Sequence, residues 1–273
     1  MKTKKNKIII NPLISVIVNC HNGELYLKKS IKSIISQSYK NWEIIFFDNK
    51  STDNSKKIIK KFEDHRIHYF RSNKFLNLYQ ARNLAVEKAK GKYLCFLDVD
   101  DYWTKDKLKK QINFISNNKE YKIVYSNYFC KIEKKKQFFQ KYKSGTLPKG
   151  YITEKLLKDY CVGILTLMID RDVFNYYKFK NSYNIIGDFD FIIRASLKFK
   201  IGCIQEPLAY YRIHNSNYSE KKMDLQINEH KHWILKNEKV MKNFSISINS
   251  LKKRIFKLSL KSYLKSFGRV VQW

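Results

Sequence analysis

The chain contains few residues that break regular structure, with 3 Pro and 8 Gly among 273 residues. Hydrophobic residues make up 44% and aromatic residues 15%, so the composition excludes collagen-like chains and disordered chains rich in Pro and Gly. No run of about 18 apolar residues is present, which excludes a membrane-spanning helix. The length predicts one large domain, or one domain with an appendage.

The cysteines follow no known pattern. Five are present at widely separated positions, and no two of them form a Cys-x-x-Cys pair. This favours neither a disulfide framework nor a zinc site and is typical of a reducing cytosol. Residues 1–18 have the basic start and apolar run of a signal peptide, but Asn11-Pro12 interrupts the run and no small-residue cleavage site follows. We therefore expect this segment to stay on the chain.

Acidic residues are scarce relative to basic ones. Lys and Arg number 55 against 24 Asp and Glu, which gives a net charge of +31. This excess suits nucleic acid, an anionic membrane surface or a phosphorylated substrate, and does not choose among them. A bias toward residues of AT-rich codons would produce the same excess. The charge therefore leaves the partner open.

Short apolar runs alternate with segments of helical period between residues 13 and 129. This alternation predicts an α/β fold, with a parallel sheet that carries helices on both faces and binds ligands beyond the carboxyl ends of its strands. The expected strands are 14–20, 42–48, 67–71, 93–97 and 123–129, and the expected helices are 23–36, 51–62, 80–89 and 105–115.

The pattern is looser beyond residue 129. Segments 164–169 and 208–213 look like later strands, and 188–197 reads as an amphipathic helix. Two further helices are expected after residue 218, the second over 249–267. We divide the chain into a body, residues 1–218, and a basic helical appendage, residues 219–273.

Three carboxylates gather where the fourth expected strand ends. Asp98, Asp100 and Asp101 fall within four positions, where they repel one another unless a cation or hydrogen bonds compensate them. Mg²⁺ or Mn²⁺ is typically held by one or two carboxylates plus substrate phosphates, so Asp98 and Asp100 could clamp a nucleoside diphosphate. An acidic turn that caps the helix after Thr104 would leave the same pattern.

Five motifs follow one another along the chain, at residues 12–22, 36–43, 48–55, 81–83 and 91–101. In their order and spacing they resemble family 2 glycosyltransferases of the GT-A fold. The resemblance is close over residues 12–130 and loose to about residue 215. It implies a Rossmann-like nucleotide-binding half over 12–130, an acceptor half over 131–218 and a mostly parallel central sheet. It also implies inverting transfer of a sugar from a nucleoside diphosphate to an acceptor hydroxyl, with Mn²⁺ or Mg²⁺ as cofactor.

The resemblance assigns the donor-binding residues. Asn19 and His21 would cradle the nucleobase, and Asp48 and Asn49 would read the base and ribose. The resemblance favours a UDP-sugar donor. Asn49 departs from it, because a second aspartate is usual at this position, although the Asn49 amide oxygen can still accept the uracil N3 proton. Arg82 would support the acidic cluster or the donor, although an ordinary surface arginine at a helix start fits as well.

The resemblance also assigns the metal site. Asp100 would bind the ion directly, and Asp98 would bind the ribose or reach the ion through water, whereas Asp101 would be structural. Arg212 and His214, in a late Tyr-Arg-x-His motif, would approach the diphosphate or the metal. A purely structural role is equally compatible with His214.

The catalytic base implied by the resemblance is Asp188. Residues 187–190 resemble the Glu-Asp-x-Asp segment of the family, with Gly187 in place of the usual acidic neighbour. At a helix N-terminus the dipole would keep Asp188 ionised until it accepts a proton. Asp188 could instead be an N-cap, with Asp190 as the next candidate for the base.

The tail could pack on the core, form a dimer contact or lie on a membrane. Basic residues around a stripe of Leu251, Ile255 and Leu258 favour an interfacial helix on anionic lipid. We therefore expect a cytoplasmic enzyme, peripheral on the inner face of the membrane, that acts on a lipid-linked saccharide or growing surface glycan. The rival hypotheses are a nucleic-acid-binding protein, whose basic residues would gather on one face, and an inactive glycosyltransferase-like scaffold.

Overall fold

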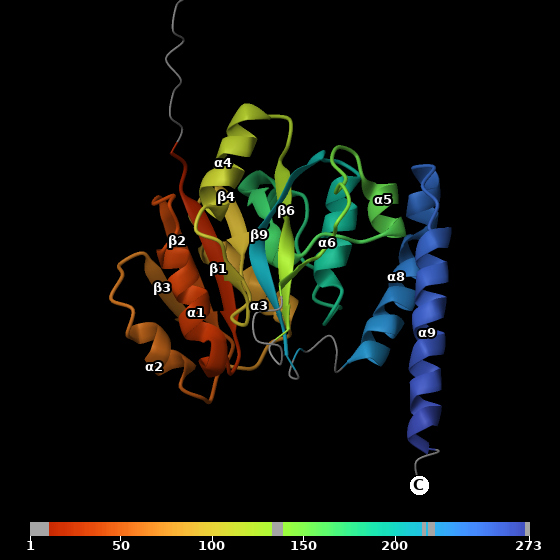
Figure 1. Ribbon diagram of the computed structural model, residues 1–273, viewed down its shortest axis with the longest axis horizontal. Coiled ribbons are helices and arrows are strands. Elements are labelled where there is room, and N and C mark those ends of the chain that lie inside the picture. The colour runs from red at the N-terminus through yellow and green to blue at the C-terminus, as the bar shows by residue number, and fades with distance from the viewer. Residues whose placement is uncertain (1–10, 133–138, 215–216, 218–221, 271–273) are drawn as a thin grey trace, which may run out of the picture.

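The computed structural model describes residues 11–132, 139–214, 217 and 222–270. Helices cover both faces of one central sheet (Figure 1), as the α/β prediction requires. The strands are β1 (Ile14–Cys20), β2 (Trp42–Asp48), β3 (Ile67–Arg71), β4 (Tyr93–Phe96), β5 (Tyr102–Trp103), β6 (Ile123–Ile132), β7 (Phe139–Lys141), β8 (Met168–Asp170) and β9 (Ile201–Ile213).

The strand order brings the predicted donor-binding segments to one edge of the sheet. The order is β3-β2-β1-β4-β8-β6-β9-β5, with β7 beside β6. Strands β3, β2, β1 and β4 are mutually parallel, so the residues that follow β1, β2 and β4 meet at the same edge. Strand β8 is antiparallel to both of its neighbours, and β6 and β9 are parallel. The sheet is therefore mostly parallel, as predicted.

Each face of the sheet has its own apolar layer, because side chains alternate along a strand. In β1, Ile14 and Val16 pack toward α1, α2 and α4, whereas Ile17 packs toward α3, α5 and α6. The helices are α1 (Glu24–Ile35), α2 (Ser55–Lys60), α3 (Leu78–Lys88), α4 (Lys107–Asn117), α5 (Thr153–Lys158), α6 (Gly187–Ser196), α8 (Met223–Asn243) and α9 (Asn249–Val270).

Two predicted strands differ from the observed elements. Segment 164–169 forms a 3₁₀ turn, Ile164–Thr166, followed by the short strand β8. Segment 208–213 is the second part of β9, which is 13 residues long. Its polar middle, 205–207, interrupts the apolar pattern, and the register against β6 shifts next to Pro207, which has no N–H to donate.

The predicted tail helices form and pack against the body. Helices α8 and α9 lie side by side along the edge of the molecule beyond α6 (Figure 1). Trp233 of α8 is fully buried, and Leu251 and Ile255 of α9 are 0% and 2% exposed in the same core as α6. The prediction that the stripe containing Leu251 and Ile255 meets a membrane is therefore wrong, since an amphipathic pattern does not identify what covers its apolar face. The division at 218/219 lies outside the described residues.

Among the described helices, none combines the length and apolar character needed to cross a bilayer.

Candidate active site

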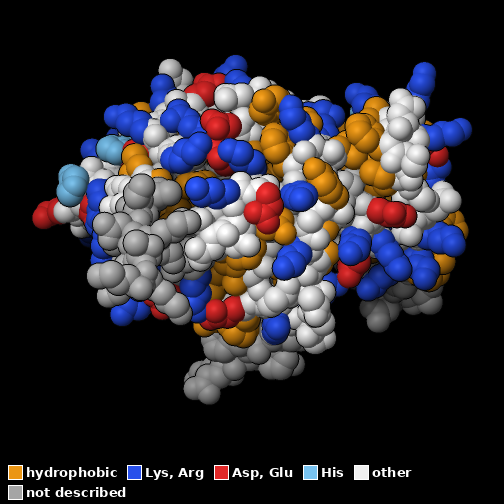
Figure 2. Space-filling model, turned by 90° about the horizontal axis from the view of Figure 1, so that it is seen from above, with side chains coloured by type: hydrophobic (Ala, Val, Ile, Leu, Met, Phe, Trp, Pro, Cys, Tyr) orange, Lys and Arg blue, Asp and Glu red, His pale blue; other side chains and the backbone are white. Residues whose placement is uncertain are grey.

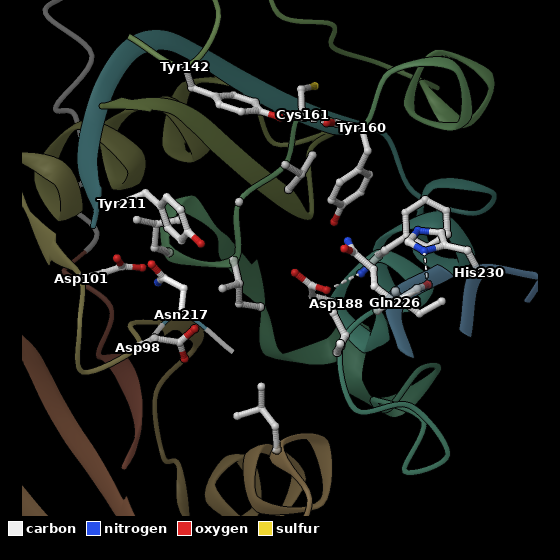
Figure 3. A pocket seen from close by; sticks show the side chains of 18 of the residues that line it. Asp98, Asp101, Tyr142, Tyr160, Cys161, Asp188, Tyr211, Asn217, Gln226 and His230 are labelled. Carbon is white, nitrogen blue, oxygen red and sulfur yellow. Dashed lines mark hydrogen bonds between the residues drawn. The ribbon is translucent and has the colours of Figure 1, made fainter. Parts of the chain in front are cut away.

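One cavity of about 590 Å³ brings together residues from the two predicted halves of the site. Asp98 and Asp101 line one side, and Asp188, Gln226 and His230 line the opposite side (Figure 3). The acidic residues follow β4, whereas Asp188 lies in the first turn of α6. The topology therefore places a candidate metal clamp and a candidate base around the same space.

Arg82 holds Asp98 of the acidic cluster in place. Its buried guanidinium donates to Oδ1 and Oδ2 of Asp98 at 2.6 and 2.9 Å. Burial works against the charge of Arg82, but Asp98 more than compensates, so the pKa of Arg82 is raised. The alternative of an ordinary surface arginine is therefore wrong, and Arg82 supports the cluster as expected.

The other two carboxylates connect the cluster to the end of β9. Nε2 of His214 lies 3.1 Å from Oδ2 of Asp100, and Oδ1 of Asp101 accepts the backbone N–H of Arg212 at 2.9 Å. Burial and the charge of Asp98 raise the pKa of Asp100, while the hydrogen bond from His214 opposes this shift. Burial also raises the pKa of Asp101 well above its usual value. The structure thus brings His214 to the acidic cluster and gives Asp101 a structural contact.

The chemistry of this cluster fits a hard divalent cation. Two carboxylates and an imidazole lie together. The pKa of Asp100 is raised by burial and by repulsion from Asp98, and a bound cation would offset both effects. Within the described residues, no three His, Cys, Asp or Glu side chains are placed to bind one metal ion. An ion bound by Asp100 together with Asp98 or His214 would keep free coordination positions. Phosphate oxygens and water would fill these positions, as is usual for Mg²⁺ and Mn²⁺.

The nucleobase end of the predicted donor site lies where β1 and β2 finish. Nδ1 of His21 is 2.9 Å from the carbonyl oxygen of Asn49, and the His21 ring packs against Phe75 with 4.7 Å between centroids. Asn19 is buried, and in the described part of the chain neither polar atom of its side chain has a hydrogen-bond partner. A bound ligand could supply the missing partner.

Asp48 and Asn49 shape the adjoining loops. Oδ1 of buried Asp48 accepts the N–H of Ser51 at 2.7 Å, and Oδ2 accepts the Tyr69 hydroxyl at 2.6 Å. The Asn49 amide donates to the carbonyl of Leu76 at 2.8 Å and accepts its N–H at 2.9 Å. Recognition of the nucleobase by Asn49 stays a prediction. It would require the Asn49 amide to break its hydrogen bonds with the backbone of Leu76.

Asp188 lies in the first turn of α6 and faces the cavity. The N-cap of this helix is Ile186, so the N-cap alternative for Asp188 is wrong. Oδ1 of Asp188 accepts the N–H of Phe189 at 2.8 Å and lies 3.2 Å from the Tyr79 hydroxyl. Burial raises the pKa of Asp188, and the positive charge of Arg82 opposes the shift. A half-buried carboxylate with a raised pKa is suited to proton abstraction.

Asp190 does not face the cavity. Its fully buried carboxylate lies 2.7 Å from Arg194 and 3.2 Å from Lys180, and it accepts the indole N–H of Trp233 at 3.0 Å. These contacts connect α6 to α8. Asp190 is therefore a structural residue, and the suggestion that it could replace Asp188 as the base is wrong.

Comparison with known families decides the class of the protein. The family model described as Glycosyl transferase family 2 matches residues 15–178, a segment that includes the donor-side residues and the acidic cluster. The chain belongs to this family.

The curated relatives of this glycosyltransferase include proteins that are themselves named as glycosyltransferases. One is the "Putative teichuronic acid biosynthesis glycosyltransferase TuaG" of Bacillus subtilis (strain 168), 30% identical over 77% of this chain and 83% of its own length. Another is the "UDP-Glc:alpha-D-GlcNAc-diphosphoundecaprenol beta-1,3-glucosyltransferase WfgD" of Escherichia coli, 33% identical over 61% of this chain and 64% of its own length.

Solved structures show the same fold. S. aureus TarS 1-349 in complex with UDP-GlcNAc superposes with a TM-score of 0.64 at 20% identity, over 81% of this chain and 66% of that one. The mannosyltransferase PcManGT from Pyrobaculum calidifontis, in complex with GDP-Man and Mn²⁺, gives a TM-score of 0.60 at 13% identity, over 86% of this chain and 65% of that one. The predicted GT-A fold is confirmed.

Several residues that line the cavity were not singled out by the sequence. Tyr160 follows α5, His230 and Gln226 come from α8, and Arg254 comes from α9. Burial lowers the pKa of His230 to about 4, so its imidazole is neutral at pH 7. The tail helices α8 and α9 of this glycosyltransferase therefore complete its cavity.

Proposed function

We propose that the chain is an inverting, metal-dependent glycosyltransferase that uses a UDP-sugar and extends a lipid-linked saccharide of a growing surface glycan. The observation that carries this proposal is the single cavity that has the Asp98–Asp100 cluster on one side and Asp188 on the other. Inversion in one displacement needs an acceptor hydroxyl opposite the leaving group, and this arrangement leaves room for one.

In the proposed step Asp188 takes the proton of the acceptor hydroxyl while that oxygen forms its bond to the anomeric carbon. The bond from this carbon to the diphosphate oxygen breaks, and UDP leaves. Asp98 and Asp100 would hold Mg²⁺ or Mn²⁺ with the diphosphate, and the bound ion would neutralise its developing charge. Arg82 keeps Asp98 in place from the buried side.

The relatives support the choice of substrates. WfgD is named for transfer from UDP-Glc to a GlcNAc diphosphoundecaprenol, and a TarS structure contains UDP-GlcNAc. The PcManGT complex contains Mn²⁺. These names support a UDP-sugar donor, a divalent cation and a lipid-linked acceptor for this chain.

A screen of nucleoside diphosphate sugars tests the proposal. With Mn²⁺ present, at least one UDP-sugar should raise the melting temperature, because a ligand at about 100 times its dissociation constant stabilises the native state by about 2.7 kcal/mol. That sugar should then be transferred to a lipid-linked acceptor analogue with inverted anomeric configuration. Stabilisation by ADP- or GDP-sugars alone would contradict the UDP choice, and binding without transfer or hydrolysis would favour the inactive scaffold.

The exposed side chains on the outer face of α9 support the proposal that the protein binds peripherally to the cytoplasmic leaflet of the membrane. Phe256, Leu260 and Leu264 are 70%, 50% and 61% exposed, and Lys257 and Lys261 lie among them. This face is opposite the buried stripe of α9. Exposed apolar side chains beside lysines are typical of helices that lie on anionic lipid.

Replacing Phe256 and Leu260 together by Ser should therefore reduce binding to vesicles that contain phosphatidylglycerol, by about tenfold or more, without lowering the melting temperature. Each exposed side chain would otherwise bury apolar area in the bilayer. Sedimentation with vesicles measures the effect. Leu25→Ser is the control, since Leu25 is 81% exposed on the distant helix α1. If the wild type ignores these vesicles at low salt, the proposed contact is absent.

The nucleic-acid alternative requires basic residues concentrated on one face. On the face seen in Figure 2, Lys and Arg side chains are spread across the view and do not gather over one element. This distribution gives the alternative no support on that face.

A further inference from the structure

The cavity has a second charged end, which the proposed reaction does not use. Arg254 lines the cavity together with Ile255 and Leu258 of α9, while His230 of α8 lies nearby. The acidic cluster lies on the side of the cavity opposite His230 (Figure 3), and Arg82 already compensates Asp98 there. The basic end is thus separate from the clamp for the donor diphosphate.

Arg254 is a half-buried cation available to a ligand. In the part of the chain that the structure describes, its guanidinium has no hydrogen bond or ion pair. Asp159 lies close enough to favour its charge, but Asp159 forms its ion pair with Lys143 at 2.7 Å. A guanidinium presents donors in a planar fork that matches a phosphate or carboxylate, and it costs free energy when it is buried without such a partner.

His230 and Tyr160, which line the cavity with Arg254, add no charge of their own. Burial lowers the pKa of His230 to about 4, with the charge of Arg254 contributing, so His230 is neutral at pH 7. The nearby Tyr160 stays un-ionised, because burial raises its pKa well above the usual value. Arg254 therefore supplies the positive charge at this end of the cavity, on the same side as the candidate base Asp188.

The position of α9 identifies the kind of anion. One side of the helix lines the cavity through Arg254, Ile255 and Leu258, and the other exposes Phe256 and Leu260 beside lysines. An anion held by Arg254 would therefore lie between the reacting sugar and a face suited to lipid. In a lipid-linked sugar the diphosphate lies between the sugar and the lipid, which matches this arrangement. A uronic acid also carries an anion, its carboxylate, but it has no lipid that would contact the exposed face of α9.

We infer that Arg254 binds the diphosphate of a lipid-linked acceptor and thereby presents the acceptor sugar to Asp188. This inference rests on the proposed function, because it assumes that the cavity receives an acceptor of this class. Arg254 is then a residue for acceptor recognition supplied by α9.

The test compares two acceptors that differ in charge. One is N-acetylglucosamine diphosphate joined to a ten-carbon chain, and the other is the uncharged decyl glycoside of the same sugar. Arg254→Gln should raise KM for the diphosphate acceptor by about 10- to 100-fold, as expected for the loss of a charge-assisted contact. The KM for the uncharged acceptor and the affinity for UDP should change by less than about twofold, and Arg254→Lys should restore part of the loss, since it keeps the charge.

Lys252→Gln is the matched control, because Lys252 is exposed on the same helix and pairs with Glu238 on the surface. Equal increases in KM for both acceptors would show a packing role for Arg254, and an unchanged KM would also overturn the inference. The inference would also be overturned if Arg254→Gln raised KM for decyl glucuronide but not for the diphosphate acceptor.

Direct binding separates this inference from the proposed function. Calorimetry measures the binding of decyl diphosphate to the protein saturated with UDP and Mg²⁺, whether or not sugar is transferred. Loss of this binding in Arg254→Gln would support the anion site even if the wild type transferred no sugar. Equal binding by wild type and Arg254→Gln would overturn it even if transfer were demonstrated.

Discussion

Replacing Asp100 by Asn is expected to abolish sugar transfer and to weaken Mn²⁺-dependent binding of UDP by about 100-fold or more. Asp100 lies beside Asp98 and contacts His214, and its carboxylate is the charged ligand that the cluster offers besides Asp98. Mutation of a residue that only hydrogen-bonds to a metal ligand typically lowers metal affinity by about 10- to 100-fold. Loss of a charged ligand should therefore lower it at least as much. Titration of UDP with and without Mn²⁺ measures the effect.

Asp101→Asn is the control for this experiment. Asp101 is 2% exposed and accepts the N–H of Arg212, a contact that the Asn amide oxygen can keep. Because burial holds the pKa of Asp101 well above its usual value, a neutral side chain suits its position. We expect UDP binding within a few-fold of wild type. Metal-dependent binding that survives in Asp100→Asn would remove Asp100 from the metal site.

The donor side of the site could be predicted from the sequence because its residues follow strands directly. Asp48 ends β2 and Asp98 follows β4. Because β2 and β4 are parallel strands of one sheet, their carboxyl ends lie at the same edge irrespective of the conformation of the loops. The contacts of the amide of Asn49 with Leu76 could not be predicted, since they depend on the path of a loop.

The close contact between Gly187 and Tyr79 could not be predicted from the sequence. The resemblance implies only that Gly187 replaces the usual acidic neighbour of Asp188. In the structure the ring of Tyr79 fills this space, and a Cβ atom at position 187 would lie 2.5 Å from it. A side chain at 187 and the ring of Tyr79 therefore exclude one another. No local pattern connects two positions so far apart in the chain.

The tail was the least predictable part of the site. Its helical period fixes which residues share a face, but not which face meets the body. The pattern alone predicts a lipid contact for Leu251 and Ile255, but both side chains are buried in the core, and Ile255 lines the cavity together with Arg254. Burial of α9 also means that its removal would expose the core, so point substitutions test the tail better than truncation.

Asp188→Asn should cut the rate of transfer by about 100-fold or more while UDP and Mn²⁺ affinities stay near wild type. A general base acts on the acceptor and not on the donor, so the loss should fall on kcat. The fold should survive, because the Asn amide oxygen can still accept the N–H of Phe189. Asp159→Asn is the matched control, since Asp159 is another carboxylate that lines the cavity, paired with Lys143.

The pH dependence gives a second measurement of the same role. Burial raises the pKa of Asp188 above 3.8, and only the deprotonated form can accept the proton. The wild-type kcat should therefore be at its maximum above this raised pKa and should fall as the pH drops through it. This fall should occur at a higher pH than the protonation of an exposed carboxylate. In Asp188→Asn the small remaining rate should lose this acid limb, because Asn does not titrate. A folded Asp188→Asn enzyme that binds donor and keeps both the rate and the acid limb would exclude Asp188 as the base. Since Asp190 is buried against Arg194 and Trp233, the proton would then have to leave through a group other than these two carboxylates.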